Sequence, residues 1–361
     1  MSAPVGRRPA VRDDLVELSG YHSPQVSVDV RLNTNESPVP PPPGFRDALA
    51  AEVARIDWHR YPDRPATELR AALAQLHGVE VGQVFCANGS NEVLQTLLLT
   101  YGGPGRTAAT FEPTYALHSH ISRITGTTVA VGERAEDFTV DLDEVARVLD
   151  DAAPHVTFLC SPNNPTGTTE APETIRAVAE RATGIGSLVV VDEAYGQFAS
   201  WSALELIDED TPLVVTRTFS KTWSMAAMRL GYLIGPSWVV AELEKVVLPY
   251  HLDAVTQIAG RVALRDVDAM NERVAGIVAE RERVVSRLRE LAVTVWPSGS
   301  NFVLFRPQQL DGHEVWQRLL DRSVLIRDCS SWPRLTGCLR ATIGTSAEND
   351  AFLDALTEAL R

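Results

Sequence analysis

The chain has 361 residues, of which 45% are hydrophobic and 22% are charged. The composition is ordinary for a globular protein. The length is enough for one large domain and a smaller one with a substantial core. The formal net charge of -14 argues against nucleic acid as a general partner, although an acidic protein can still hold a small anion in a local cationic pocket.

The four cysteines are scattered and form no C-x-x-C pair, so we expect reduced thiols and no metal site. The N-terminus lacks the apolar core of a secretory signal, and no apolar run is long enough to span a bilayer. We therefore expect no membrane contact and a cytoplasmic location.

The N-terminal segment, which we place at residues 1–44, begins with a polar stretch of little periodicity. It ends in a proline cluster at 40–43 that can be neither helix nor central strand. The polar stretch is expected to be either a lid that orders over substrate or a frayed end. Apolar residues at helical spacing then predict helices over 44–56 and 67–77, the second closed by Gly78.

Short β-branched runs alternate with helix-like stretches in the middle of the chain. These runs are 84–87, 107–111, 127–131, 155–160, 188–191, 213–216 and 232–234. They predict an α/β fold with a mainly parallel seven-stranded central sheet flanked by helices. In such a sheet, ligand-binding groups gather at the carboxyl ends of the strands.

A long helical stretch over 255–291 is expected to lead out of the large domain, which we place at 45–255. The remaining strand-like runs lie at 293–295, 302–305, 324–326 and 339–343. They predict a smaller α+β domain, which includes the linking helix and covers 256–361.

Several polar residues could bind a phosphate group. The turn Asn88-Gly89-Ser90-Asn91-Glu92 follows a strand and opens a helix, where free N–H groups and the helix dipole favour an anion. Taken alone, this turn fits an ordinary helix cap by Ser90 or Asn91 better. Thr218, Ser220 and Arg229 strengthen the phosphate interpretation, because they could complete the site with charge-assisted hydrogen bonds.

Lys221 and Asp192 follow two of the apolar runs. A lysine enclosed near Arg229 would have a lowered pKa and could form a Schiff base. The alternative is a lysine in a surface turn, where most lysines lie. Asp192 could pair with the pyridine nitrogen of pyridoxal phosphate (PLP) and keep it protonated, or it could cap a helix.

Three further residues could contact the same ring. Tyr195 and Asn164 could bind its phenolic oxygen, although Asn-Pro is also a common turn. Tyr115 could stack on the ring or lie in the core.

In this order, the residues resemble those of the fold-type I PLP-dependent aminotransferases over essentially the whole chain. The matching motifs are Asn88-Gly89-Ser90-Asn91, Pro113-Thr114-Tyr115, Asn164-Pro165-Thr166-Gly167, Asp192-Glu193-Ala194-Tyr195, Ser220-Lys221 with Arg229, and Leu339-Arg340. Within this family the chain looks most like the histidinol-phosphate aminotransferases. The pointers are the motifs at 31–36, 59–63, 248–252, 326–328 and 340–345.

The resemblance implies a homodimeric enzyme that transfers an amino group between histidinol phosphate and 2-oxoglutarate in histidine biosynthesis. Its PLP would be a Schiff base on Lys221, with Lys221, Asp192 and Tyr195 as the catalytic residues. The implied cofactor-binding residues are Gly89, Ser90, Asn91, Tyr115, Asn164, Asp192, Tyr195, Thr218, Ser220, Lys221, Arg229 and, from the partner subunit, Tyr61. The implied substrate-binding residues are Tyr21, Asn35, Arg327 and Arg340, two of which carry guanidiniums that suit an anion.

The chain departs from the common family pattern at Ser37, Asn91 and Trp223. An aminotransferase for phenylalanine or tyrosine and a threonine-phosphate decarboxylase on the same scaffold are the alternative enzymes. A non-catalytic cofactor-binding or regulatory module is the alternative from another class. Fusion regulators of this fold need an added DNA-binding domain, for which we expect no room before Asn33, and the net charge opposes it.

Overall fold

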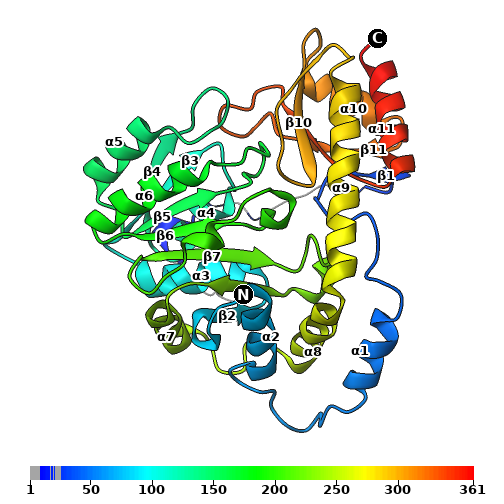
Figure 1. The fold of residues 1–361 in the computed structure, drawn as a ribbon. Helices are drawn as coiled ribbons and strands as arrows, with labels where there is room; N and C mark the ends of the chain where they lie inside the picture. Colours follow the sequence, from blue (N-terminus) through cyan, green and yellow to red (C-terminus); the bar gives the residue numbers. More distant parts are fainter. Residues whose placement is uncertain (1–8, 17, 19, 21–25) are drawn as a thin grey trace, which may run out of the picture.

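The structure is a computed structural model that describes residues 9–16, 18, 20 and 26–361. Its centre is a seven-stranded sheet (Figure 1). In sheet order the strands are β2 (Val84–Ala87), β8 (Gly231–Ile234), β7 (Leu213–Thr218), β6 (Leu188–Asp192), β5 (Val156–Cys160), β3 (Thr107–Glu112) and β4 (Thr128–Glu133). Only β8 runs antiparallel to its neighbours, so the predicted mainly parallel sheet is confirmed.

Helices cover both faces of this sheet because its strands are apolar on both sides. On β6, Val190 packs with residues of α3, α4 and α7, whereas Val189 and Val191 pack with α5 and α6. The helices of this part are α1 (Phe45–Val53), α2 (Thr67–His77), α3 (Ser90–Tyr101), α4 (Leu117–Ile124), α5 (Leu142–Ala152), α6 (Pro172–Gly184), α7 (Ser237–Val246) and α8 (Ala254–Ala263). Consecutive strand residues therefore belong to two different cores.

The prediction of a single helix over 255–291 is wrong in one respect. Two helices are present, α8 and α9 (Val267–Leu288), with a 3-10 turn at Leu264–Asp266 between them. Asp266 has non-helical angles, with φ -116° and ψ 46°. Helix α8 packs on α1 and α2, whereas α9 packs on the C-terminal sheet and α11, so the chain changes partners at this turn (Figure 1).

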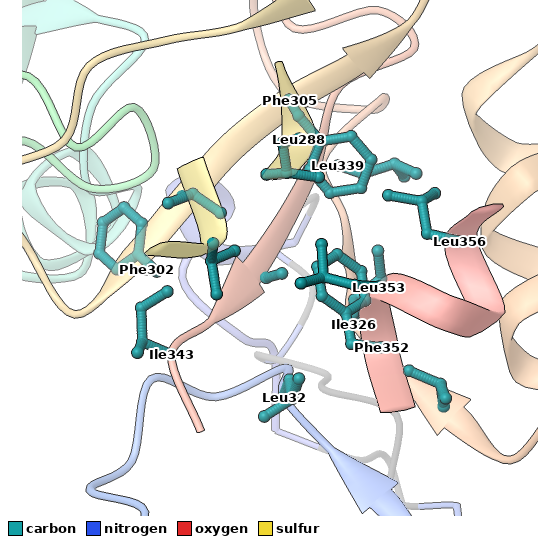
Figure 2. Packing of buried hydrophobic residues seen from close by; sticks show 14 of the residues in the cluster. Leu32, Leu288, Phe302, Phe305, Ile326, Leu339, Ile343, Phe352, Leu353 and Leu356 are labelled. Atoms are coloured by element: carbon teal, nitrogen blue, oxygen red, sulfur yellow. The ribbon is translucent and has the colours of Figure 1, made fainter. Parts of the chain in front are cut away.

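The small domain is an α+β unit, as predicted. Its antiparallel sheet has the order β12 (Arg327–Asp328), β13 (Leu339–Thr342), β10 (Phe302–Pro307) and β9 (Val293–Val295). Helices α10 (Gly312–Leu320) and α11 (Ser346–Ala359) pack beside it. Figure 2 shows the core that they enclose, with Phe302, Phe305 and Phe352 almost fully buried.

The part of the N-terminal segment around residues 30–32 joins this small domain. Strand β1 (Val30–Arg31) pairs in parallel with β11 (Val324–Leu325), and Leu32 enters the core in Figure 2. The run at 324–326 was predicted as a strand and contains β11, whereas β1 and β12 were not predicted, because two-residue strands carry no readable period. The expected lid falls partly on residues outside the described set.

Two general properties of the described residues bear on function. No helix among them is both long and apolar enough to cross a membrane. The same residues contain no group of three or more histidine, cysteine or acidic side chains that could hold a metal ion.

Candidate active site

A cavity of about 360 Å³ lies at the carboxyl ends of the parallel strands. Strands β5, β6 and β7 end at its wall, and the small domain closes it from the other side. It is lined by thirteen of the residues predicted for the site: Asn35, Ser90, Asn91, Tyr115, Asn164, Asp192, Tyr195, Thr218, Ser220, Lys221, Arg229, Arg327 and Arg340. The fold therefore brings together residues that lie up to 305 positions apart in the chain.

Three predicted residues are not in this lining. Gly89 lies directly beside it, under Arg229. Tyr61 is 79% exposed and stacks on Tyr250, with the ring centroids 4.4 Å apart. Tyr21 lies outside the described residues.

Lys221 is one of only two lysines in the chain, the other being Lys245. Its amine lies 3.3 Å from the carbonyl oxygen of Thr34 and 5.6 Å from the centre of the Tyr195 ring. Burial lowers the pKa of Lys221 to about 8, and the guanidinium of Arg340 adds to this effect. The sequence pointed to Arg229 as the neighbouring cation, but its effect is smaller than that of Arg340. A neutral amine is therefore available near neutral pH.

Asp192 ends β6 and is 1% exposed. Its Oδ1 accepts a hydrogen bond from the backbone N–H of Ala194, and its Oδ2 lies 3.0 Å from Nε2 of His118. His118 is a residue that sequence reasoning missed. It stacks on Phe158 at 4.7 Å, and its Nδ1 has no partner among the described residues. The carboxylate is thus fixed from two sides at the cavity wall.

Tyr195 and Asn164 face the cavity beside Asp192. The hydroxyl of Tyr195 accepts a hydrogen bond from Nδ2 of Asn35 at 2.9 Å, and burial raises the pKa of Tyr195 to about 12. Oδ1 of Asn164 accepts a hydrogen bond from Nη1 of Arg340 at 2.5 Å. Both side chains are therefore held by residues outside the large sheet.

The predicted phosphate-binding groups gather at the N-terminus of α3. The capping residue is Gly89, which offers no side-chain cap, so the ordinary cap by Ser90 or Asn91 is not formed. A Cβ at Gly89 would lie 2.7 Å from Nη2 of Arg229. A Cβ at Gly231 would overlap the backbone nitrogen of Ser90. Glycine at both positions thus lets α3 begin close to the guanidinium.

Hydroxyl groups complete this cluster. The Ser220 hydroxyl accepts hydrogen bonds from Nη1 of Arg229 and from Thr218, each at 3.0 Å. The Tyr115 hydroxyl donates to Oδ1 of Asn91 at 3.1 Å. Together they form a cationic, donor-rich end of the cavity, and this arrangement suits a phosphate group.

A second cationic end lies on the small domain. Arg340 is 5% exposed and pairs across the strands with Arg327. Its Nη2 donates to the carbonyl oxygen of Asn33 at 3.0 Å, and its buried Nε has no partner among the described residues. Since no carboxylate of the described residues pairs with Arg340, this guanidinium can bind an external anion.

Comparison with known proteins settles the family. The profile named "Aminotransferase class I and II" matches residues 27–356. The chain belongs to this family. The family resemblance predicted from the motifs is therefore confirmed, and so is the expectation that the chain is an aminotransferase.

The chain is also similar to several curated histidinol-phosphate aminotransferases. It is 47% identical to the one from Streptomyces avermitilis, with 96% of each chain covered. It is 46% identical to the one from Frankia casuarinae, with 97% of this chain and 90% of the relative covered. A crystal structure of histidinol-phosphate aminotransferase from Sinorhizobium meliloti in complex with pyridoxal-5'-phosphate has a TM-score of 0.85. At 24% identity, with 93% of this chain and 92% of that chain covered, that structure supports the aminotransferase fold alone.

Proposed function

We propose that this aminotransferase uses PLP, bound covalently through Lys221, to exchange an amino group between histidinol phosphate and 2-oxoglutarate. The relatives at 46 to 47% identity carry the name of that activity. The observation that carries the proposal in the structure is the cavity with a lysine amine between two cationic ends. One end suits the phosphate of the cofactor, and the other suits the anion of the substrate.

The residues present fit PLP by their chemistry. The cluster of Ser90, Thr218, Ser220 and Arg229 matches a phosphate dianion. Asp192 offers a buried carboxylate to a pyridinium N–H, and Lys221 offers an amine with a pKa of about 8. Bound there, PLP supplies an electron sink for the negative charge that develops on the substrate α-carbon.

The chain's own residues then have separate tasks. The Asp192 carboxylate, held by His118, would keep a proton on the pyridine nitrogen. The Lys221 amine would take the proton from the substrate α-carbon and return it at C4′ of the cofactor. Tyr115, which lines the cavity, would stack on the ring, and Tyr195 and Asn164 would bind its phenolic oxygen. These groups orient the ring and place the base.

The substrate anion would be held by Arg340, with Arg327 beside it. The same pair would bind the carboxylate of glutamate or 2-oxoglutarate and the phosphate of histidinol phosphate. Asn35 links this end to the ring site, because it donates to Tyr195 and accepts a hydrogen bond from Thr342 at 3.0 Å. Tyr21 remains a predicted helper.

A homodimer with shared sites is part of the proposal. Tyr61, which would reach the partner's cofactor phosphate, is exposed in the single chain. Leu248 is 76% exposed and Trp58 is 71% exposed, and Tyr250 stacks on Tyr61. Tyr61 and Tyr250 thus form an exposed aromatic pair, and contiguous exposed apolar surface is typical of a protein interface. We keep the predicted cytoplasmic location as part of the same proposal.

Reduction with borohydride tests the covalent cofactor site. Treatment of the PLP-loaded protein should fix one cofactor per chain on the peptide that contains Lys221. Lys245→Arg should label to the same extent, because Lys245 is exposed and pairs with Glu242. Label on Lys245 in the wild type, with none on Lys221, would contradict the assignment.

A product assay tests the reaction class. With histidinol phosphate and 2-oxoglutarate, glutamate should form without release of carbon dioxide. Carbon dioxide from threonine phosphate would instead support the decarboxylase alternative. Lys221→Ala should lose turnover by about 10²–10⁴-fold or more, as for a lost general acid or base.

A further inference from the structure

Trp332 lies in the wall of the active-site cavity, although no motif pointed to it. It belongs to the loop between β12 and β13, whose ends are joined by a hydrogen bond from the Cys329 N–H to the Cys338 carbonyl oxygen. The backbone of Trp332 donates to Cys329 and accepts from Leu335. Cys329, Leu335 and Cys338 are buried, so the indole is carried by an anchored loop.

The indole contacts both cations of the substrate end. The centre of the Arg327 guanidinium lies 5.5 Å from the Trp332 ring, and that of Arg340 lies 6.0 Å from it. Within about 6 Å an indole attracts a cation through its quadrupole. One side chain can therefore stabilise two guanidiniums at once.

This contact offsets an unfavourable arrangement. Arg327 and Arg340 are direct cross-strand partners in the antiparallel pair of β12 and β13. Like charges in such a position repel each other and destabilise the pair. The indole of Trp332 attracts both guanidiniums and so reduces the effect of this repulsion. A bound substrate anion would reduce it further, because its charge is opposite to theirs.

The same residue separates two cavities. A second cavity, of about 290 Å³, shares Trp332 and Ala116 with the first and contains Glu112 and Arg123. The indole therefore bounds the anion end of the active site on that side. Its loss would open this end to the second cavity and to water.

We propose that Trp332 is a positioning residue that holds Arg327 and Arg340 for the anionic group of the substrate. It would favour substrates that carry a phosphate or two carboxylates over amino acids whose only anionic group is the α-carboxylate. This inference rests on the proposed function in one respect, namely that the two guanidiniums bind the substrate rather than the cofactor.

The test compares Trp332→Leu and Trp332→Phe with the matched variants Trp296→Leu and Trp296→Phe. Trp296 packs against the same apolar cluster and contacts Arg306 at 5.7 Å, but it does not line the active-site cavity. Binding of inorganic phosphate to the PLP-loaded proteins is measured by titration calorimetry, because the cofactor site is then filled. KM and kcat for histidinol phosphate are measured in parallel.

We expect Trp332→Leu to weaken phosphate binding about tenfold and to raise KM by a similar factor, with kcat nearly unchanged. Trp332→Phe should keep most of the affinity, since it retains an aromatic ring. Unchanged phosphate binding in Trp332→Leu, an equal loss in Trp332→Phe, or an equal loss in Trp296→Leu would each overturn the proposal. Should Trp332→Leu fail to fold, Trp332→Met supplies the same comparison.

The two proposals can fail separately. If the wild type binds phosphate but does not convert histidinol phosphate, the proposed function fails. The difference in phosphate binding between Trp332→Leu and Trp296→Leu still decides whether Trp332 holds the guanidiniums.

Discussion

The rate at which the cofactor-free protein captures PLP should rise with pH only up to about 8. Burial and the Arg340 guanidinium lower the pKa of Lys221 to about 8 from its usual 10.5, and only the neutral amine attacks the aldehyde. At pH 7.5 a pKa of 8 leaves roughly a quarter of the amine neutral, against roughly a thousandth for an ordinary lysine. The reactive fraction of the amine is thus about two-hundredfold larger than in an unperturbed lysine, and capture should be correspondingly faster at this pH.

Stopped-flow absorbance between pH 6.5 and 9.5 measures this rate. The same titration with a small amine of known pKa corrects for protonation of PLP itself. In Arg340→Gln the plateau should begin at higher pH, because one of the cations that oppose protonation is gone. Arg306→Gln is the matched control, since Arg306 lies on β10 outside the cavity lining. A wild-type rate that still climbs tenfold per pH unit through pH 9.5 would refute the reasoning.

Three further outcomes are expected. Asp192→Asn should keep the cofactor but slow the half-reaction at least about a hundredfold, because the pyridine nitrogen loses its anionic partner; an unchanged single-turnover rate would count against this role. Tyr61→Ala and Lys221→Ala should each be inactive, yet a mixture of the two should regain activity through one intact site per heterodimer; no recovery after verified subunit exchange would argue against a shared site. Phe352→Ala should lower the free energy of unfolding by about 3–5 kcal/mol, since Phe352 is 1% exposed in the core of Figure 2; a change below about 1 kcal/mol in chemical denaturation would contradict that packing.

The large sheet could be predicted because its strands are marked locally. Runs such as 188–191 are apolar on both faces, and parallel strands covered by helices need such runs. The strand-end residues Asp192 and Lys221 followed from the rule that ligand groups gather at that edge. The break between α8 and α9 could not be predicted, since Leu264–Asp266 contains neither proline nor glycine and the turn reflects tertiary packing.

The site residues that were missed share one property. His118 reaches Asp192 from α4, and Trp332 reaches Arg340 from a loop of the small domain. Neither is adjacent in sequence to the residue that it contacts, so only the fold reveals the pair. One signal was available for His118, because it lies only three residues after Tyr115. The role of Tyr61 depends on a second chain and stays a prediction.

The most direct test of the proposed function is a single-turnover half-reaction. The PLP-loaded protein is mixed separately with histidinol phosphate and with phenylalanine, and the conversion to pyridoxamine phosphate is followed by absorbance. Histidinol phosphate should be converted fast, with a much lower kcat/KM for phenylalanine, because a phosphate dianion matches the charge of Arg327 and Arg340 better than the single carboxylate of phenylalanine does. Equal or faster conversion by phenylalanine would contradict it.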